Sequence, residues 1–137
     1  MIVLDTNIIS ELMRISPDLR VLQWMKGRDP QQLCITAITV QEIEFGLNRL
    51  PSGKRKEALE IVWQRAKSTY GSFPYTEEAA SETAIALSSG LKNGHPIQIA
   101  DAQIAGICLS LGATLATRNT KDFAHINGLK LCNPFER

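Results

Sequence analysis

The chain has 137 residues, of which 44% are hydrophobic and 21% charged, and its formal net charge at pH 7 is +1. This composition is typical of one globular domain, and the small net charge excludes a general electrostatic attraction to nucleic acid, so any such attraction needs local basic patches. No apolar run reaches membrane-spanning length and no basic leader precedes the first apolar stretch. We therefore expect a cytoplasmic protein without a membrane anchor, in which the three cysteines are reduced thiols.

Short apolar strands alternate with amphipathic helices along the chain. In chain order the patterns predict a strand at 2–4, a helix after Thr6 or Asn7, helices at 17–27, 39–50, 54–68, 77–93 and 99–111, and strands at 33–35, near 73–75, at 115–117 and at 129–131. Such alternation favours parallel strands joined by right-handed crossovers. We predict one three-layer α/β domain, residues 1–137, with a mostly parallel central sheet of four to five strands flanked by helices.

Four acidic residues fall at the edge where strands end and helices begin. Asp5 ends the first strand, Glu42 lies in the first turn of the helix after the second strand, Asp101 starts a helix among apolar neighbours, and Asp122 follows strand 115–117. Carboxylates held close together repel each other unless one is protonated or a cation enters. Mg²⁺ or Mn²⁺ prefers such oxygen ligands and promotes the hydrolysis of phosphodiesters. The pattern indicates a metal-dependent hydrolase.

Each of these acids also has a purely structural interpretation. Asp5 could simply cap the first helix. The run Thr39-Val40-Gln41-Glu42 fits a capping box, in which the glutamate binds the amide of the cap residue. Asp101 could merely complement the dipole of its helix, and Asp122 could be a turn residue. The sequence leaves these alternatives open.

Basic residues near the acids are candidate contacts to a phosphate backbone. Arg118 and Lys121 flank the last acidic position, and Lys54-Arg55-Lys56 opens a helix where cations oppose the dipole, although a solvated basic face would look the same. Contacts of this kind give affinity with little sequence readout. Our candidate substrate-binding residues are Thr6, Asn7, Arg118 and Lys121.

Four stretches together resemble the PIN-domain ribonucleases, in particular the VapC/FitB-type toxins of bacterial type II toxin–antitoxin systems. These stretches are residues 2–11, 38–46, 99–105 and 116–123, and they follow one another in family order and at family spacing. The closing Asn133-Pro134-Phe135 also matches. Each stretch alone is a weak signal, but the four together are specific.

The resemblance implies a PIN fold, Mg²⁺- or Mn²⁺-dependent endoribonuclease activity on RNA, and a homodimer. It also implies inhibition by a small cognate antitoxin that carries a DNA-binding domain and inserts its C-terminal segment into the site. By motif, Asp5, Glu42 and Asp101 correspond to the metal-binding acids. Many relatives have aspartate at the position of Asn119, so either Asn119 or Asp122 would serve as the fourth residue. We expect the catalytic site to comprise Asp5, Glu42, Asp101, Asn119 and Asp122.

Two other functions remain possible from the sequence. A metal-dependent DNA or flap nuclease of the same fold would use the same acids on a different substrate. A non-catalytic PIN-like module would bind nucleic acid without a metal, having lost it through Asn119. Digestion of RNA, DNA and flap substrates distinguishes the first alternative, and titration with Mn²⁺ distinguishes the second.

Overall fold

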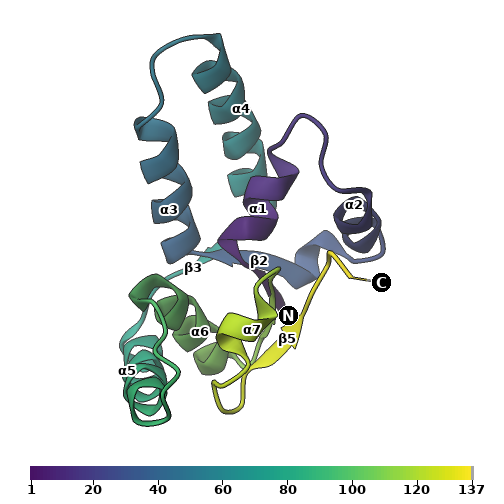
Figure 1. The fold of residues 1–137 in the computed structure, drawn as a ribbon. Coiled ribbons are helices and arrows are strands. Elements are labelled where there is room, and N and C mark those ends of the chain that lie inside the picture. Colours follow the sequence, from purple (N-terminus) through teal and green to yellow (C-terminus); the bar gives the residue numbers. More distant parts are fainter. Residues whose placement is uncertain (137) are drawn as a thin grey trace.

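The computed structural model, which describes residues 1–136, has a central sheet with helices on both faces (Figure 1). Five parallel strands lie in the order β3-β2-β1-β4-β5. Their bounds are β1 Ile2–Leu4, β2 Leu33–Thr36, β3 Ser72–Phe73, β4 Thr114–Ala116 and β5 Lys130–Cys132. The predicted three-layer α/β architecture is confirmed, and the sheet is entirely parallel.

The central strand β1 divides the core into two apolar clusters. Val3 pairs with Cys34 of β2 and with Leu115 of β4, and these three side chains belong to one cluster. Leu4 and its partner Ala116 belong to the other. Because successive side chains of a strand point to opposite faces, each cluster lies on its own face of the sheet. The apolar run at residues 2–4 is therefore buried on both sides, as expected for a parallel strand.

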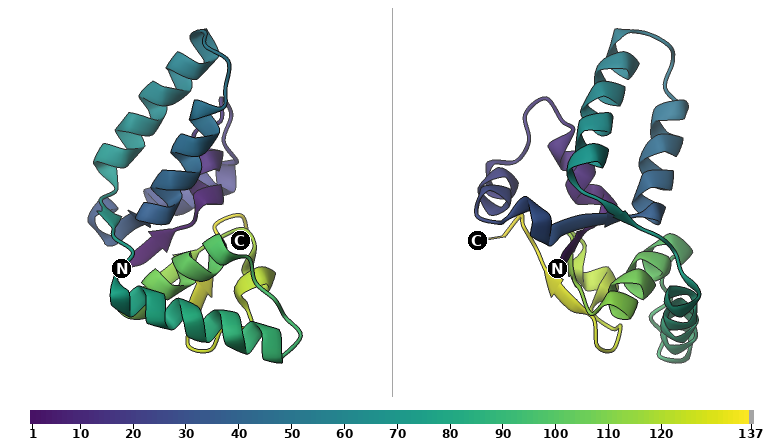
Figure 2. Two further views of the ribbon diagram at one scale, coloured as in Figure 1. Left: turned by 90° about the vertical axis from the view of Figure 1, so that its left-hand side faces the viewer. Right: turned by 180° about the vertical axis from the view of Figure 1, so that it is seen from behind.

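Helices cover the two faces in two groups (Figures 1 and 2). One face carries α1 Thr6–Leu12, α2 Leu19–Lys26, α3 Ala37–Asn48 and α4 Lys54–Thr69. The other carries α5 Glu77–Lys92, α6 Ile99–Leu111 and the short α7 Thr120–Phe123. A 3₁₀ turn, Pro30–Gln32, precedes β2. The predicted start of α2 at residue 17 is wrong because Asp18 caps that helix, its side chain accepting a hydrogen bond from Arg20 N.

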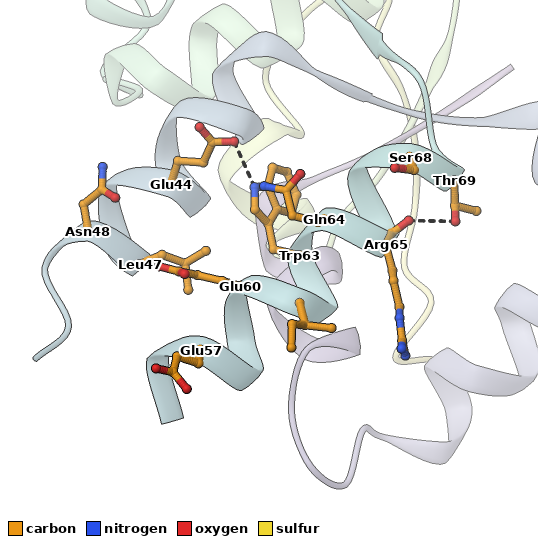
Figure 3. Close-up of a pocket in the computed structure, with 11 residues that line it drawn as sticks. Glu44, Leu47, Asn48, Glu57, Glu60, Trp63, Gln64, Arg65, Ser68 and Thr69 are labelled. Carbon is orange, nitrogen blue, oxygen red and sulfur yellow. Dashed lines mark hydrogen bonds between the residues drawn. The ribbon is translucent and has the colours of Figure 1, made fainter. Parts of the chain in front are cut away.

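Helices α3 and α4 form a hairpin that projects from the sheet (Figure 1). Its main cross-link is the indole of buried Trp63, whose Nε1 donates to Glu44 Oε2 at 2.9 Å (Figure 3). Lys67 Nζ lies 2.9 Å from the same oxygen. The hydrogen bonds from Trp63 and Lys67 hold the pKa of Glu44 below its ordinary value. Glu44 therefore fastens α4 to α3.

The fold bears on the expected lack of a membrane anchor and on the expected state of the cysteines. None of the helices within residues 1–136 combines the length and the apolar character needed to cross a membrane. The three cysteines are free thiols, with Cys34 and Cys108 buried and Cys132 partly exposed.

Candidate functional site

Asp5 lies at the junction of β1 and α1, at the centre of the sheet edge. Its backbone N–H donates to the carbonyl of Ala116 in the neighbouring strand at 2.9 Å. Its carboxylate is only 4% exposed and accepts hydrogen bonds from Thr6 N at 2.8 Å and from Thr117 Oγ1 at 2.7 Å. Asn7 Nδ2 approaches the same carboxylate at 3.3 Å. Asp5 is thus the cap of α1, and its carboxylate is also held in place by Thr117, the residue that follows β4.

Thr6 links Glu42 to Asp5, because it donates a hydrogen bond to each of the two carboxylates. The Thr6 hydroxyl donates to Glu42 Oε1 at 2.7 Å and lies 2.9 Å from Thr39 Oγ1. The capping-box interpretation of Glu42 is wrong, because α3 begins at Ala37 and its cap is Thr36, whose hydroxyl accepts from Thr39 N at 3.2 Å. Glu42 consequently stands in the second turn of α3 instead of the first, and its carboxylate binds the start of α1.

Asp101 occupies the first turn of α6 and is partly buried. Burial raises its pKa to about 6, with further contributions from the negative charges of Asp5, Glu42 and Asp122. The N-terminus of a helix favours a carboxylate, yet burial and the neighbouring acids raise the pKa of Asp101. The pKa of Asp5 is also raised, chiefly by burial, against the hydrogen bonds from Thr117 and Thr6. The acids therefore act on one another.

One open pocket collects these groups at the carboxyl edge of the sheet. It is lined by the predicted residues Asp5, Glu42, Asp101, Asn119, Thr6, Asn7 and Arg118. A larger groove between α3 and α4 also contains glutamates, but Glu44 there is paired with Trp63 and Lys67 (Figure 3). The pocket at the sheet edge differs in that two of its acids, Asp5 and Asp101, are at least partly buried and have raised pKa values. The pocket is therefore the stronger candidate for cation-assisted chemistry.

Asp122 and Lys121 do not line this pocket, contrary to expectation. Asp122 lies in the short helix α7, and it lines a separate small cavity with His95 and His125. The two imidazole rings are stacked with their centroids 3.5 Å apart. Asp122 affects the pocket through its charge, which helps raise the pKa of Asp101. Of the two candidates for the fourth position, only Asn119 lines the pocket.

The segment that carries Asn119 is tied to both ends of the chain. The backbone N–H of Asn119 donates to Thr117 Oγ1 at 3.1 Å, and that of Arg118 donates to Asn7 Oδ1 at 3.2 Å. The Arg118 guanidinium carbon lies 4.7 Å from the ring centroid of Phe135, a cation–π distance. The closing Asn133-Pro134-Phe135 run thus helps to position Arg118 beside the acids.

Sequence reasoning missed several residues of this region, among them Thr117 and Glu11. Thr117 is fully buried, and its hydroxyl joins Asp5 to the loop after β4. Glu11, only 5% exposed, accepts from Arg14 Nη1 at 3.2 Å and from Asp18 N at 2.9 Å, and it also lines the pocket. A sequence signal existed for Glu11: it follows Ile8 by three residues, which places an acid on the buried face of α1.

The acids of the pocket have the chemistry of divalent-ion ligands but are not arranged around an ion. Within residues 1–136 no three Asp, Glu, His or Cys side chains are grouped so as to hold an ion as they stand. The donor chemistry nevertheless fits Mg²⁺ or Mn²⁺, because the acids offer only oxygen ligands. The raised pKa of Asp101 reflects burial and unbalanced negative charge, which a cation would offset. Asp5, Glu42 and Asp101 are the residues that would hold it.

Comparison with known proteins gives concordant results. A model of the PIN domain matches residues 2–129. The chain is 36% identical over 139 residues to the VapC ribonuclease Y4jK of Sinorhizobium fredii, covering 99% of each chain. It is 35% identical to the toxin FitB of Neisseria gonorrhoeae, covering 90% of this chain and 91% of FitB. A chain in the structure of FitAB bound to an IR36 DNA fragment superposes with a TM-score of 0.93 at 33% identity, covering 100% of this chain and 97% of the other. The chain therefore belongs to the PIN domain family.

Proposed function

We propose that this protein is a Mg²⁺- or Mn²⁺-dependent endoribonuclease that acts as the toxin of a toxin–antitoxin pair. The observation that carries the proposal is the convergence of Asp5, Glu42 and Asp101 on one pocket, where their charges help raise the pKa of Asp101 to about 6. RNA as the substrate is supported by the relative of Sinorhizobium fredii, which is called a VapC ribonuclease. The toxin role is supported by the likeness to FitB.

The residues of the pocket divide the chemistry of hydrolysis among them. A divalent ion bound by the three acids would polarise the phosphodiester and offset the negative charge around it. Asp5 is the rigid member, because two hydrogen bonds from Thr6 and Thr117 fix its carboxylate. Glu42 is the most exposed of the three acids, so it either contributes to ion binding or accepts the proton of the attacking water. The water oxygen bonds to phosphorus and loses a proton to Glu42 or to solvent, the bond from phosphorus to the ribose oxygen breaks, and that oxygen takes a proton from solvent.

An apolar groove beside the pocket is the proposed seat of the antitoxin. The groove and the pocket share Thr6, Ser10, Arg14 and Glu42. The apolar lining of the groove comes from Met13, Ile15, Ile43, Leu47, Ala58 and Leu59. A segment lying in it would run directly into the acids and would inhibit by occupying the site. The relative structure FitAB is a complex bound to DNA, which supports a DNA-binding partner. A homodimer remains an expectation from the family resemblance.

Replacing Asp5 with asparagine tests the proposed activity. Asp5→Asn keeps the shape of the side chain and removes its charge, so RNA cleavage in Mn²⁺ is expected to fall to background while the circular dichroism spectrum is retained. The matched control is Asp29→Asn, since Asp29 also caps a helical turn, accepting from Gln31 N at 3.0 Å, but lies outside the pocket. The control is expected to cleave like the wild type.

The substrate class is decided in the same assay. Single-stranded RNA, single-stranded DNA and a flap duplex are digested in parallel, with and without a chelator. Cleavage of RNA alone, abolished by the chelator, is the expected result. Undiminished RNA cleavage by Asp5→Asn would refute the assignment of the site, and cleavage of the DNA substrates in preference to RNA would replace the proposed substrate.

A further inference from the structure

We propose that Arg14 is a substrate-positioning residue that contacts a phosphate of the RNA strand next to the acidic pocket. This inference rests on the proposed ribonuclease function and adds a residue that the motifs of the sequence do not single out. Arg14 lines the same pocket as Asp5, Glu42 and Asp101, and its side chain is 65% exposed. It therefore stands at the boundary between the acids and solvent, where the strand on one side of the cleaved bond must pass.

A buried acid holds Arg14 in this position. Arg14 Nη1 lies 3.2 Å from both carboxylate oxygens of Glu11, which is only 5% exposed. Glu11 Oε2 also accepts the backbone N–H of Asp18 at 2.9 Å, so the carboxylate itself is fixed. A guanidinium group has five N–H donors, and this pairing occupies one nitrogen. The remaining donors are available to a ligand and are presented by a side chain whose orientation is already restricted.

The negative charge of the pocket explains why a positively charged side chain beside it would help to bind RNA. Three carboxylates repel the phosphates of an incoming strand, and a bound divalent ion compensates only part of that charge. Arg118 lines the same pocket and is held by Phe135, so the pocket contains two guanidinium groups that are each anchored by a neighbour. Guanidinium groups bind phosphate through paired hydrogen bonds and give affinity without reading the base. Arg14 and Arg118 can thus guide the backbone toward the acids.

The alternative role for Arg14 is to latch the loop between α1 and α2, since Glu11 joins both Arg14 and Asp18. The two roles differ in their dependence on salt. A phosphate contact releases a counterion, so its loss lowers the slope of log affinity against log salt by about 0.7 for a single strand. A latch has no such signature, and its loss changes only stability.

The experiment measures binding of a fluorescent oligouridine RNA from 50 to 300 mM NaCl in the presence of a chelator (roughly the range in which counterion release is resolved). All variants carry Asp101→Asn to prevent cleavage. Arg14→Gln is expected to weaken binding several-fold and to lower the salt slope by about 0.7. The matched control is Arg20→Gln, because Arg20 also pairs with an acid, Asp18, at 2.7 Å but does not line the pocket. The control should leave affinity and slope unchanged.

A double variant separates the contact from folding and from net charge. Arg14→Gln with Glu11→Gln removes one charge of each sign, keeps the net charge of the parent, and leaves two amides that can hydrogen-bond in place of the ion pair. It is expected to fold and to show the same lowered slope. If both Arg14 variants bind like Arg20→Gln, the inference is overturned while the proposed function stands. If the parent binds no RNA and the wild type cleaves none, the proposed function fails and the inference fails with it.

Discussion

The ionised form of Asp101 is destabilised by burial and by the other acids of the pocket. It is partly buried, and Asp5, Glu42 and Asp122 all raise its pKa. Asp5 has hydrogen bonds from Thr6 and Thr117 that offset part of its own burial. No hydrogen bond is among the causes acting on the pKa of Asp101, so a cation near this side chain would relieve the greatest repulsion. In the absence of metal, the same repulsion should lower the stability of the folded protein.

The pH dependence of stability follows from the pKa of Asp101. The folded value is about 6 and the ordinary value is 3.8, so the folded protein binds more protons than the unfolded chain between these pH values. Stability therefore falls as pH rises from about 4 to 6 and stays reduced above that range. Asp101→Asn is expected to raise the Tm at pH 7.5 in a chelator by a few degrees, or about 1 kcal/mol after solvent screening, with the gain shrinking toward pH 4.

Asp18 provides a control of opposite sign. Hydrogen bonds from Arg20 hold the pKa of Asp18 at about 2, so its ionised form stabilises the fold above pH 3.8. Asp18→Asn keeps a helix-capping side chain and should lower the Tm at pH 7.5. An Asp101→Asn variant that melts at or below the wild-type temperature at pH 7.5 would contradict the charge repulsion assigned to the pocket.

The sequence predicts the positions of the acidic site residues better than it predicts the residues that hydrogen-bond to them. The positions of Asp5 and Asp101 follow from strand ends and helix starts, and both line the pocket as expected. Thr117 could not be identified, because its importance depends on a hydrogen bond to Asp5 across 112 positions of the chain. Lys121 and Asp122 were placed by proximity in sequence to Arg118 and Asn119. A helical turn at 120–123 separates them from the pocket, and a four-residue helix has too weak a periodicity to predict.

Helix ends determine where the site residues stand. Thr36 both ends β2 and caps α3, so α3 begins two residues earlier than the Thr39 pattern predicts, and Glu42 moves into its second turn. Thr36 and Thr39 can both cap a helix, and the end of β2 at Thr36 makes this residue the cap. In α6 the pattern was unambiguous, and the predicted bounds agree with the helix observed at Ile99–Leu111.

The packing of α6, which carries Asp101, depends on a glycine. A Cβ added at Gly106 would lie 2.5 Å from the Ala79 carbonyl oxygen of α5 and closer still to Thr83 Oγ1. Thr83 cannot yield freely, because its hydroxyl donates to the carbonyls of Ala79 and Ala102. Gly106→Ala is therefore expected to push α6 from α5 and to lower the free energy of unfolding by about 1–3 kcal/mol. Chemical denaturation followed by circular dichroism measures this change.

Gly46 is the matched control for that substitution. It also lies inside a helix, α3, but a Cβ there would meet no atom within 4 Å. Gly46→Ala should raise the free energy of unfolding by roughly 0.5–1 kcal/mol, since alanine loses less backbone entropy in a helix. Equal effects of the two substitutions would show that the close approach of α5 and α6 is not what Gly106 provides.

At the scale of the whole molecule, the parallel sheet is what unites the site. Asp5, Glu42 and Asp101 come from the start of α1, from α3 and from α6, elements on both faces of the sheet, yet all reach its carboxyl edge. This convergence could be predicted because strand–helix alternation specifies where chain-distant ends meet. The side-chain hydrogen bonds that fix Asp5 and Glu42 could not be predicted, because they depend on contacts made only in the folded chain.

The central claim is that these three acids together form a site for a divalent cation. Calorimetric titration of the wild-type protein and of Asp101→Asn with Mn²⁺, at a pH above 7 where Asp101 is ionised, tests that claim most directly. The wild type is expected to show a saturable binding heat that disappears in Asp101→Asn. No binding heat in the wild type, or an undiminished heat in the variant, would contradict it.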